Sequence, residues 1–145
     1  MMEIMKNNSG EKMRKRIYCN QVAEPPEKTW SNMVVSDDFF FISGFTARDN
    51  DGVTINGADA YQQAKIIFEK MQCYTTAAGA SMNDILKLTI FVTNSADNES
   101  VWRARAEFFE GDFPACSLVQ VAALATPEIF VEIEAIGRIG CSSSY

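Results

Sequence analysis

The feature that most constrains the fold is a segment near the C-terminus in which apolar and polar side chains alternate with a period of two. Val131, Ile133 and Ala135 fall on one side of the alternation, and Glu132 falls on the other. This period is typical of a β-strand with one buried face, whereas an amphipathic helix repeats every 3.6 residues. We therefore predict a strand over residues 129–139, with Glu132 on the face away from the core.

A second strand-like segment spans residues 116–123, and residues 126–128 (Thr-Pro-Glu) have the composition of a turn. The two strands are expected to meet across this turn. The alternate set of Ser117, Val119, Val121 and Ala123 is the more apolar one and is expected to face the core. Cys116, Leu118 and Gln120 would then share a face with Glu132. A carboxylate there is either solvated on an exposed sheet face or part of an interface site.

The remaining elements complete an α+β pattern in the order β-β-β-α-β-α-β-β. The longer helix has an apolar stripe at helical spacing and Asp59 as its N-cap. The predicted elements outside the C-terminal pair are strands over residues 16–19, 32–35, 39–43 and 85–93 and helices over residues 60–78 and 99–110. A single mixed sheet of about six strands with two helices on one face leaves the other face bare, which predicts oligomerisation.

Composition excludes several classes of function. The chain has no histidine, which removes Ser-His-Asp and Cys-His catalysis and nearly all catalytic zinc sites. We expect no metal and no cofactor. A net charge of −6 argues against nucleic-acid binding, which requires a basic surface. No apolar run approaches the roughly 20 residues that span a bilayer, so no membrane contact is expected.

The ends of the chain are expected to lie outside the domain. Residues 1–15 are polar and basic with no apolar stretch behind them, so we predict a flexible leader rather than a secretory signal. Residues 16–139 form one domain, and residues 140–145 are predicted to be a flexible tail. The four cysteines show no CxxC pair, and without a secretory signal we expect reduced thiols and a cytoplasmic protein.

Several short motifs, taken together in order, resemble the reactive intermediate deaminase family, RidA/YjgF. They are residues 42–44 (Ile-Ser-Gly), 77–81 (Ala-Ala-Gly-Ala-Ser), 84–93, 108–114 and 131–136 (Val-Glu-Ile-Glu-Ala-Ile). The resemblance implies a chorismate-mutase-like fold and a homotrimer with small-molecule clefts between subunits. It also implies hydrolysis of imines or enamines, in which Glu132 positions water and the backbone near Ser43 and Gly44 orients the substrate.

The sequence departs from the family pattern where the substrate carboxylate binds. The family motif Pro-Ala-Arg-Ser reads Pro-Ala-Cys-Ser here, so Cys116 replaces the carboxylate-binding arginine, and Leu118 replaces a cysteine. The positions usually held by an asparagine and a tyrosine align with Trp102 and Trp30. Because the arginine would form two charge-assisted hydrogen bonds, its loss predicts a substrate other than 2-aminoacrylate.

Each candidate site residue also has a structural interpretation. Cys116 is a candidate nucleophile or a small packed thiol with no base to activate it. Arg105, like Arg103, is a candidate anion clamp or a solvated helix charge. Trp30 and Trp102 either stack on a planar ligand or contribute only packing.

Three functions follow from these residues. The resemblance favours an imine or enamine hydrolase that acts on a pathway intermediate, with 2-aminomuconate deaminase as a relative in the wider family. The missing arginine equally suggests a trimer that binds a small molecule without turning it over. A third possibility is a pathway enzyme that uses the same cleft for cyclisation or tautomerisation.

Overall fold

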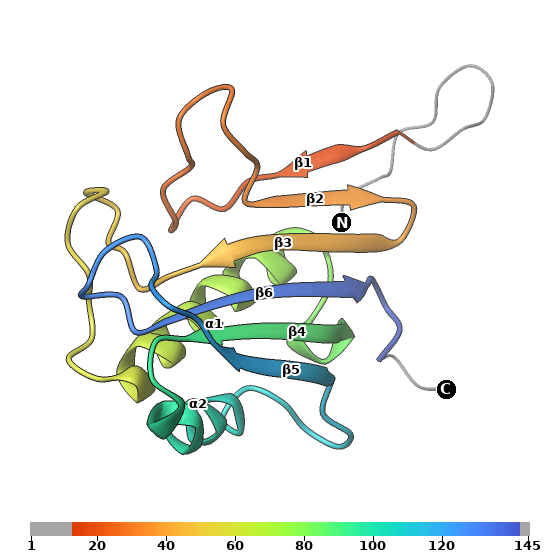
Figure 1. Ribbon diagram of the computed structural model, residues 1–145. Coiled ribbons are helices and arrows are strands. Elements are labelled where there is room, and N and C mark those ends of the chain that lie inside the picture. The colour runs from red at the N-terminus through yellow and green to blue at the C-terminus, as the bar shows by residue number, and fades with distance from the viewer. Residues whose placement is uncertain (1–12, 143–145) are drawn as a thin grey trace.

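The alternating segments of the sequence assemble into one mixed sheet in the computed structural model, which describes residues 13–142 (Figure 1). Within these residues the sheet has six strands in the order β1-β2-β3-β6-β4-β5. The strands are β1 (Lys15–Ile17), β2 (Met33–Ser36), β3 (Phe39–Phe45), β4 (Ile85–Val92), β5 (Ala115–Gln120) and β6 (Val131–Arg138). The helices are α1 (Ala60–Ala77) and α2 (Asn98–Arg105), with 3₁₀ turns η1 (Met82–Asp84) and η2 (Ser95–Asp97).

The strands predicted over residues 32–35 and 39–43 are confirmed, and they form a hairpin. Strands β2 and β3 pair antiparallel, with Met33 opposite Ile42 and Ser36 opposite Phe39. Asp37 adopts φ = 54° in the two-residue turn, a left-handed conformation that aspartate tolerates better than most side chains. The hairpin fixes the direction of β3, which carries Ser43 and Gly44 at its far end.

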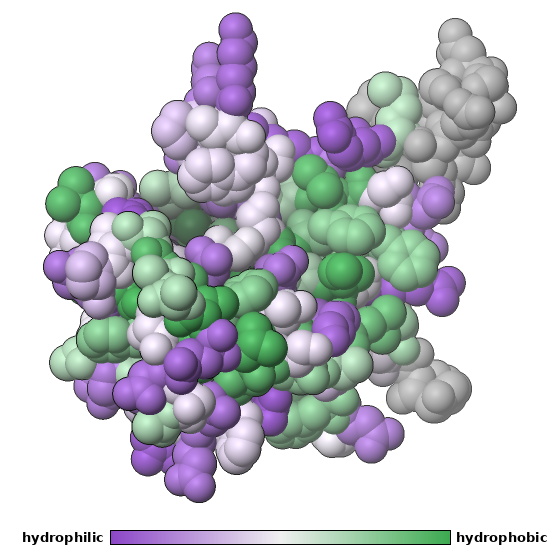
Figure 2. Space-filling model, in the orientation of Figure 1, coloured by the Kyte–Doolittle hydropathy of each residue, from purple (hydrophilic) through white to green (hydrophobic). Residues whose placement is uncertain are grey.

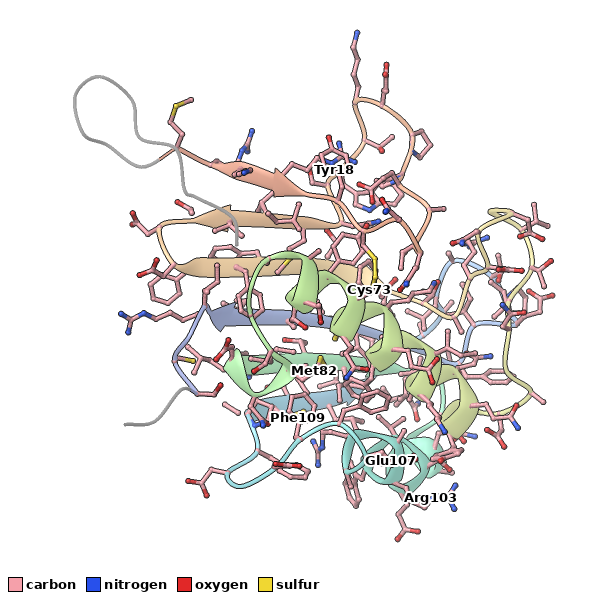
Figure 3. All side chains as sticks on the ribbon, turned by 180° about the vertical axis from the view of Figure 1, so that it is seen from behind. Tyr18, Cys73, Met82, Arg103, Glu107 and Phe109 are labelled. Carbon is pink, nitrogen blue, oxygen red and sulfur yellow. A yellow bond between two sulfur atoms is a disulfide. The ribbon has the colours of Figure 1, made fainter. Side chains whose placement is uncertain are left out.

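The long helix is also confirmed, and its apolar stripe forms the centre of the core. The Asp59 side chain accepts a hydrogen bond from the Gln62 backbone N–H and so caps α1. Behind the helix Gly79 has φ = 77°, a conformation that glycine adopts without strain. The buried residues of the stripe are Ala60, Ala64, Ile67, Phe68, Met71 and Tyr74. Figure 3, seen from behind, shows α1 lying across the sheet with α2 beside it.

The second helix is shorter than predicted, since α2 ends at Arg105 rather than near residue 110. The next residues form a tighter turn, in which the Glu107 and Phe108 N–H groups bond to carbonyls three residues back. Tertiary packing explains this early end. The rings of Phe108 and Phe109 lie 5.4 and 5.9 Å from that of Phe68 on α1, which draws the chain inward.

The prediction that the last two strands meet across a turn is wrong. Strand β4 lies between them: it pairs parallel with β5 and antiparallel with β6. Strands β4 and β5 are joined through α2, and parallel neighbours need a crossover of this length. The connection after β5 must therefore cross the end of β4 before β6 begins, so residues 126–128 do not form a hairpin turn.

The alternation along β6 is confirmed, but the face assigned to β5 is wrong. Val131, Ile133 and Ala135 are buried, whereas Glu132 is half-buried on the other face. On β5, Cys116 pairs with the buried Leu88, and both Cys116 and Leu118 pack against the core. Ser117 and Val119 therefore share the face of Glu132. A hydrogen bond from Lys87 Nζ to the Ser117 hydroxyl (2.9 Å) lies on this same side.

The sheet face opposite the helices is uncovered and apolar in its central part (Figure 2). Phe41 and Ile136 stand opposite each other on β3 and β6, and they are 42% and 38% exposed. Phe39 and Val119 are exposed to a similar degree. Side chains of this size are seldom left so exposed together on one sheet face.

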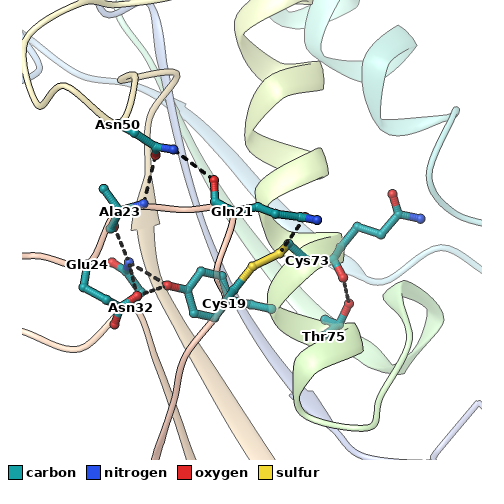
Figure 4. The surroundings of a disulfide bond; sticks show 10 residues. Cys19, Gln21, Ala23, Glu24, Asn32, Asn50, Cys73 and Thr75 are labelled. Carbon is teal, nitrogen blue, oxygen red and sulfur yellow. Dashed lines mark hydrogen bonds between the residues drawn. A yellow bond between two sulfur atoms is a disulfide. The ribbon is translucent and has the colours of Figure 1, made fainter.

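The expectation that all four cysteines are reduced is wrong for two of them. Cys19, just after β1, and Cys73 on α1 form a disulfide with a Cα–Cα separation of 6.3 Å (Figure 4). Cys116 and Cys141 are free. Sequence spacing gave no sign of the pair, because 54 positions separate the two residues and only the docking of α1 on the sheet brings them together.

The chain ends differ from expectation where the structure describes them. Strand β1 begins at Lys15, one residue inside the predicted leader, whose residues 1–12 lie outside the described part. After β6, the Asp84 carboxylate accepts hydrogen bonds from the Gly140 and Ser142 N–H groups, so the predicted flexible tail is anchored as far as Ser142. Residues 143–145 lie outside the described part. No helix between residues 13 and 142 is long and apolar enough to cross a membrane.

Candidate functional site

Glu132 lies directly against the strand backbone at Gly44. A Cβ atom placed on Gly44 would stand 3.0 Å from the Glu132 Cδ and 3.2 Å from its Oε2. The pairing of β3 with β6 shifts register between Ile42 and Phe45, and Gly44 sits within this irregularity. The absence of a side chain at residue 44 therefore makes the space in which the carboxyl group lies.

The environment of Glu132 favours a proton on its carboxyl group. Burial raises the pKa of Glu132, and the neighbouring carboxylate of Glu134 raises it further. None of the residues between 13 and 142 donates a hydrogen bond or forms an ion pair with this carboxyl group. A half-buried carboxyl group without such a partner is available to bind water or a ligand.

The backbone beside Glu132 is held rigidly by Ser43. Its N–H donates to the Asn32 carbonyl (2.9 Å), and its hydroxyl donates to the Ser31 carbonyl (2.6 Å). The Ser43 hydroxyl is thus committed to the adjoining segment. These two hydrogen bonds fix the backbone position of Ser43 next to Gly44.

Trp30 and Gly44 line one hollow of about 410 Å³, so the structure brings these two predicted site residues together. The hollow lies between residues 22–32 and residues 44–52. Figure 2 shows a recess between these segments on the uncovered side of the molecule. Val22, Pro25 and Pro26 contribute apolar wall, and Trp30 is 55% exposed. Gly44 connects this hollow to Glu132.

A polar network behind the hollow was missed by sequence reasoning. Glu24 accepts hydrogen bonds from the Tyr74 hydroxyl and from Arg16 Nη2 (3.0 Å), and the Asn32 amide donates to the Tyr74 oxygen (2.9 Å). Figure 4 shows the part of this network around Glu24 and Asn32, beside the disulfide. Burial and the Glu24 hydrogen bond raise the pKa of Tyr74. The network and the disulfide together hold the wall that carries Trp30.

Lys70 is a second residue that sequence reasoning missed. It extends from α1 to the hollow, where its Nζ donates to the carbonyls of Thr46 (2.8 Å) and Arg48 (2.6 Å). One signal was available in the sequence. Lys70 stands three residues after Ile67 and four before Tyr74, beside the apolar stripe, where a charged side chain is half-buried.

The other predicted site residues lie elsewhere in the chain. Cys116 is on the edge strand β5 and on the opposite face from Glu132. Glu132 on β6 pairs with Phe91 on β4, which pairs with Val119 on β5. Cys116 is therefore two strands away from Glu132 across the sheet and three residues away along β5. That offset corresponds to roughly 14 Å. Leu118 packs against the core beside Cys116. Within one chain, neither residue contributes to a site at Glu132.

The predicted residues of α2 form part of this second region. Trp102 is 46% exposed. The Arg105 guanidinium lies over the Phe113 ring, 5.8 Å from its centroid, and its buried Nε has no hydrogen-bond acceptor among the described residues. Arg103 lies over the Tyr61 ring, which makes it a packed surface residue. Cys116 and Leu118 therefore lie on the edge strand β5, and Arg105 lies over Phe113 in the segment that leads into it. Neither these residues nor Trp102, on the same helix as Arg105, line the hollow with Gly44 and Trp30.

Comparison with known proteins identifies relatives that match most of the chain. A family model described as Endoribonuclease L-PSP matches residues 21–139. A Dermatophagoides farinae protein, 2-iminobutanoate/2-iminopropanoate deaminase, is 36% identical over 125 residues, which are 84% of this chain and 94% of the relative. The 3-aminoacrylate deaminase RutC of Acinetobacter baylyi is 26% identical, and the match covers 88% of this chain and 100% of that protein.

Solved structures match to a similar extent. RidA from an Antarctic Psychrobacter superposes with a TM-score of 0.77 at 29% identity, covering 86% of this chain and 99% of that one. The chain therefore resembles these proteins in both sequence and fold. This protein belongs to the Endoribonuclease L-PSP family, also known as the RidA/YjgF family.

Proposed function

We propose that this protein is an imine or enamine deaminase that hydrolyses a C=N bond, with Glu132 positioning the attacking water. The observation that carries the proposal is the Glu132 carboxyl group, half-buried over Gly44 and without a hydrogen-bond donor among the described residues. The deaminase names of the two relatives compared above support the same reaction class.

The chemistry fits a site without histidine. An imine carbon is already electrophilic, so the protein needs only to hold water and to move protons. Water adds to the carbon while Glu132 accepts one of its protons. That proton then passes to the nitrogen, which gives a neutral carbinolamine. Glu132 next accepts the hydroxyl proton and delivers it to the nitrogen as the C–N bond breaks, so that ammonia leaves and the C–O bond becomes a carbonyl. The raised pKa of Glu132 makes its carboxylate a better acceptor for the proton.

The substrate is proposed to differ from 2-aminoacrylate. Cys116 cannot supply the bidentate contact of an arginine, and its side chain packs toward the core. In contrast, the hollow beside Gly44 has apolar walls and the indole of Trp30. A substrate with a larger side chain suits this space better than a three-carbon enamine.

The test is ammonia release from a panel of freshly generated imines. Wild-type protein is expected to accelerate release, and Glu132→Gln is expected to lose about 100-fold or more of that acceleration, the usual contribution of general acid–base catalysis. Glu69→Gln is the control, because Glu69 is an exposed glutamate on α1 that does not line the hollow, whereas Glu134 itself influences the pKa of Glu132. Wild-type rates in Glu132→Gln would contradict the role of Glu132. No acceleration by wild type would favour a protein that binds without turnover.

A homotrimer with inter-subunit clefts completes the proposal. It would bury the apolar face around Phe41 and Ile136, and a neighbouring copy would bring its own β5 edge, with Cys116 and Arg105, toward Glu132. Sedimentation of wild type at the trimer mass is expected. Phe41→Lys should yield monomers, whereas Val53→Lys, at a 77% exposed loop position, should not. A wild-type monomer would refute the trimer.

A further inference from the structure

The hollow beside Gly44 contains a cation that the proposed reaction does not use. The Lys70 ammonium group is held by the carbonyls of Thr46 and Arg48, which account for two of its three N–H donors. Among residues 13–142, no carboxylate lies within ion-pair distance of its Nζ. The remaining donor is available on a residue that lines the hollow.

Support of the loop after β3 is one role of Lys70, because its two hydrogen bonds tie residues 46–48 to α1. Neutral donors can make such bonds as well, and burying an ammonium group without an anion costs free energy. The chain places this charge where it lines the same hollow as Trp30 and Gly44. A role in loop support alone does not account for a charged group there.

We propose that Lys70 binds an anionic group of the substrate in this hollow. This inference rests on the proposed function, because the proposed function places the reacting C=N bond at Glu132. Thr46 lies two positions after Gly44, which corresponds to roughly 7 Å along an extended backbone. The anionic group is therefore carried at the far end of the side chain, and the substrate class is the imine of a 2-oxo acid with a second carboxylate. Val22, Pro25 and Trp30 would contact the carbon chain between the two ends.

The charges around Lys70 are consistent with an anion site. Burial lowers the pKa of Lys70 to about 8; Asp49 acts to raise this pKa and Arg48 to lower it further. Glu24 also lines the hollow, but it is already bonded to Arg16 and Tyr74. The Asp49 carboxylate accepts a hydrogen bond from the Asn50 N–H. The Arg48 guanidinium group donates to the Gly52 carbonyl, so its charge lies within residues 44–52, which line the hollow.

A bound carboxylate stabilises the protonated form of Lys70 and raises its pKa. Binding therefore takes up protons near pH 8. The affinity for the anion is expected to be full below pH 7 and to decrease as the pH rises above about 8, because the free ammonium group loses its proton there.

Calorimetric titration with two 2-oxo acids provides a test that does not depend on turnover. 2-Oxoglutarate carries the distal carboxylate and 2-oxobutanoate lacks it. Lys70→Gln keeps hydrogen-bond donors for the loop but removes the charge, and it is expected to weaken 2-oxoglutarate binding about tenfold or more. 2-Oxobutanoate binding should change by less than about twofold, and Lys70→Arg should retain 2-oxoglutarate binding.

Lys65→Gln is the matched control, because Lys65 is on the same helix and pairs with Glu107 outside the hollow (3.7 Å). It should bind both acids as wild type does. A loss of folded protein would affect the binding of both ligands, so comparing the two ligands on one variant separates the loss of the charge from a loss of folding. Thermal melting would report the folded fraction. Equal 2-oxoglutarate affinity in wild type and Lys70→Gln, or equal losses for both acids, would overturn the inference.

Turnover separates this inference from the proposed function. With imines generated from glutamate and from 2-aminobutanoate, Lys70→Gln should raise KM for the first alone, whereas Glu132→Gln should lower kcat for both. If wild type releases no ammonia yet binds 2-oxoglutarate through Lys70, the deaminase proposal fails and the anion site stands. If both imines are hydrolysed and Lys70→Gln changes neither KM, the deaminase stands and the anion site fails.

Discussion

Removal of the Cys19–Cys73 disulfide should reveal how far the wall of the hollow depends on a covalent link. The variant Cys19→Ala/Cys73→Ala is preferred to serine, because Cys19 is only 7% exposed and a serine hydroxyl there would be buried. The disulfide spans 54 positions. Opening a loop of about this length releases chain entropy in the unfolded state worth about 4 kcal/mol at 25 °C. The free energy of unfolding should fall by that amount.

The assay is equilibrium unfolding in urea, followed by the fluorescence of Trp30 and Trp102. With a urea dependence of about 2 kcal/mol per molar, the midpoint should fall by roughly 2 M. Wild type in dithiothreitol should unfold at the midpoint of the double variant. The double variant itself should not respond to the reductant.

A matched control is Cys116→Ala/Cys141→Ala, which removes the two free thiols and keeps the bond. It should respond to dithiothreitol as wild type does. The reasoning is refuted if wild type, with and without reductant, and the double variant all unfold at one midpoint. Reduction should also weaken ligand binding in the hollow, because Cys73 adjoins Tyr74, whose hydroxyl bonds to Glu24 on the hollow wall.

Two further predictions concern Glu132. Gly44→Ala would place a Cβ atom 3.0 Å from the Glu132 Cδ and displace the carboxyl group, so imine hydrolysis should fall at least tenfold, or about 1.4 kcal/mol in the barrier. The melting temperature should change little, because Gly44 is exposed; a variant with wild-type kinetics would show that the carboxyl group need not lie over Gly44. The second prediction is that Glu132→Gln stabilises the fold at pH 7. The pKa of Glu132 is raised above 4.5 in the folded state, so ionising this group costs stability as the pH rises through the folded-state pKa. Below about pH 4.5 the carboxyl group is protonated in both states, so the stability gained by Glu132→Gln should vanish there. Melting curves at pH 4 and pH 7 would check this, and an equal difference at both values would contradict it.

The location of Glu132 was accessible from the sequence because its evidence is local. The alternation of residues 131–135 fixes which side chains point away from the core, whatever strand lies alongside. Ser43 and Gly44 were also found, through the short motif at the end of β3. Their contact with Glu132 depends on the pairing of β3 with β6, which the motif does not contain.

The error on β5 shows where such reasoning fails. Ser117, Val119 and Val121 form the more apolar set, and apolarity alone assigns them to the core. Ser117 and Val119 instead lie on the uncovered face, where Phe41 and Ile136 are also exposed, and Val121 lies beyond the end of β5. Apolar residues on a face that another subunit can cover have the pattern of core residues, so composition cannot separate the two faces.

Lys70 and the disulfide depend on contacts over long sequence distances. The Lys70 ammonium group bonds to carbonyls 22 and 24 residues earlier in the chain, and Cys73 bonds to a residue 54 positions away. Both follow from the docking of α1 against the sheet. No window of neighbouring residues contains that information.

The sequence by itself determined the order and approximate positions of the strands and helices, the cap of α1 by Asp59 and the orientation of Glu132 away from the core. The reason is that periodicity and capping act between near neighbours. Only the tertiary structure decided that β4 separates β5 from β6, that Cys116 lies on the face opposite Glu132, and that Lys70 and Trp30 share one hollow. The physical reason is that strand pairing and helix docking are set by packing between distant segments, which many local patterns can satisfy equally well.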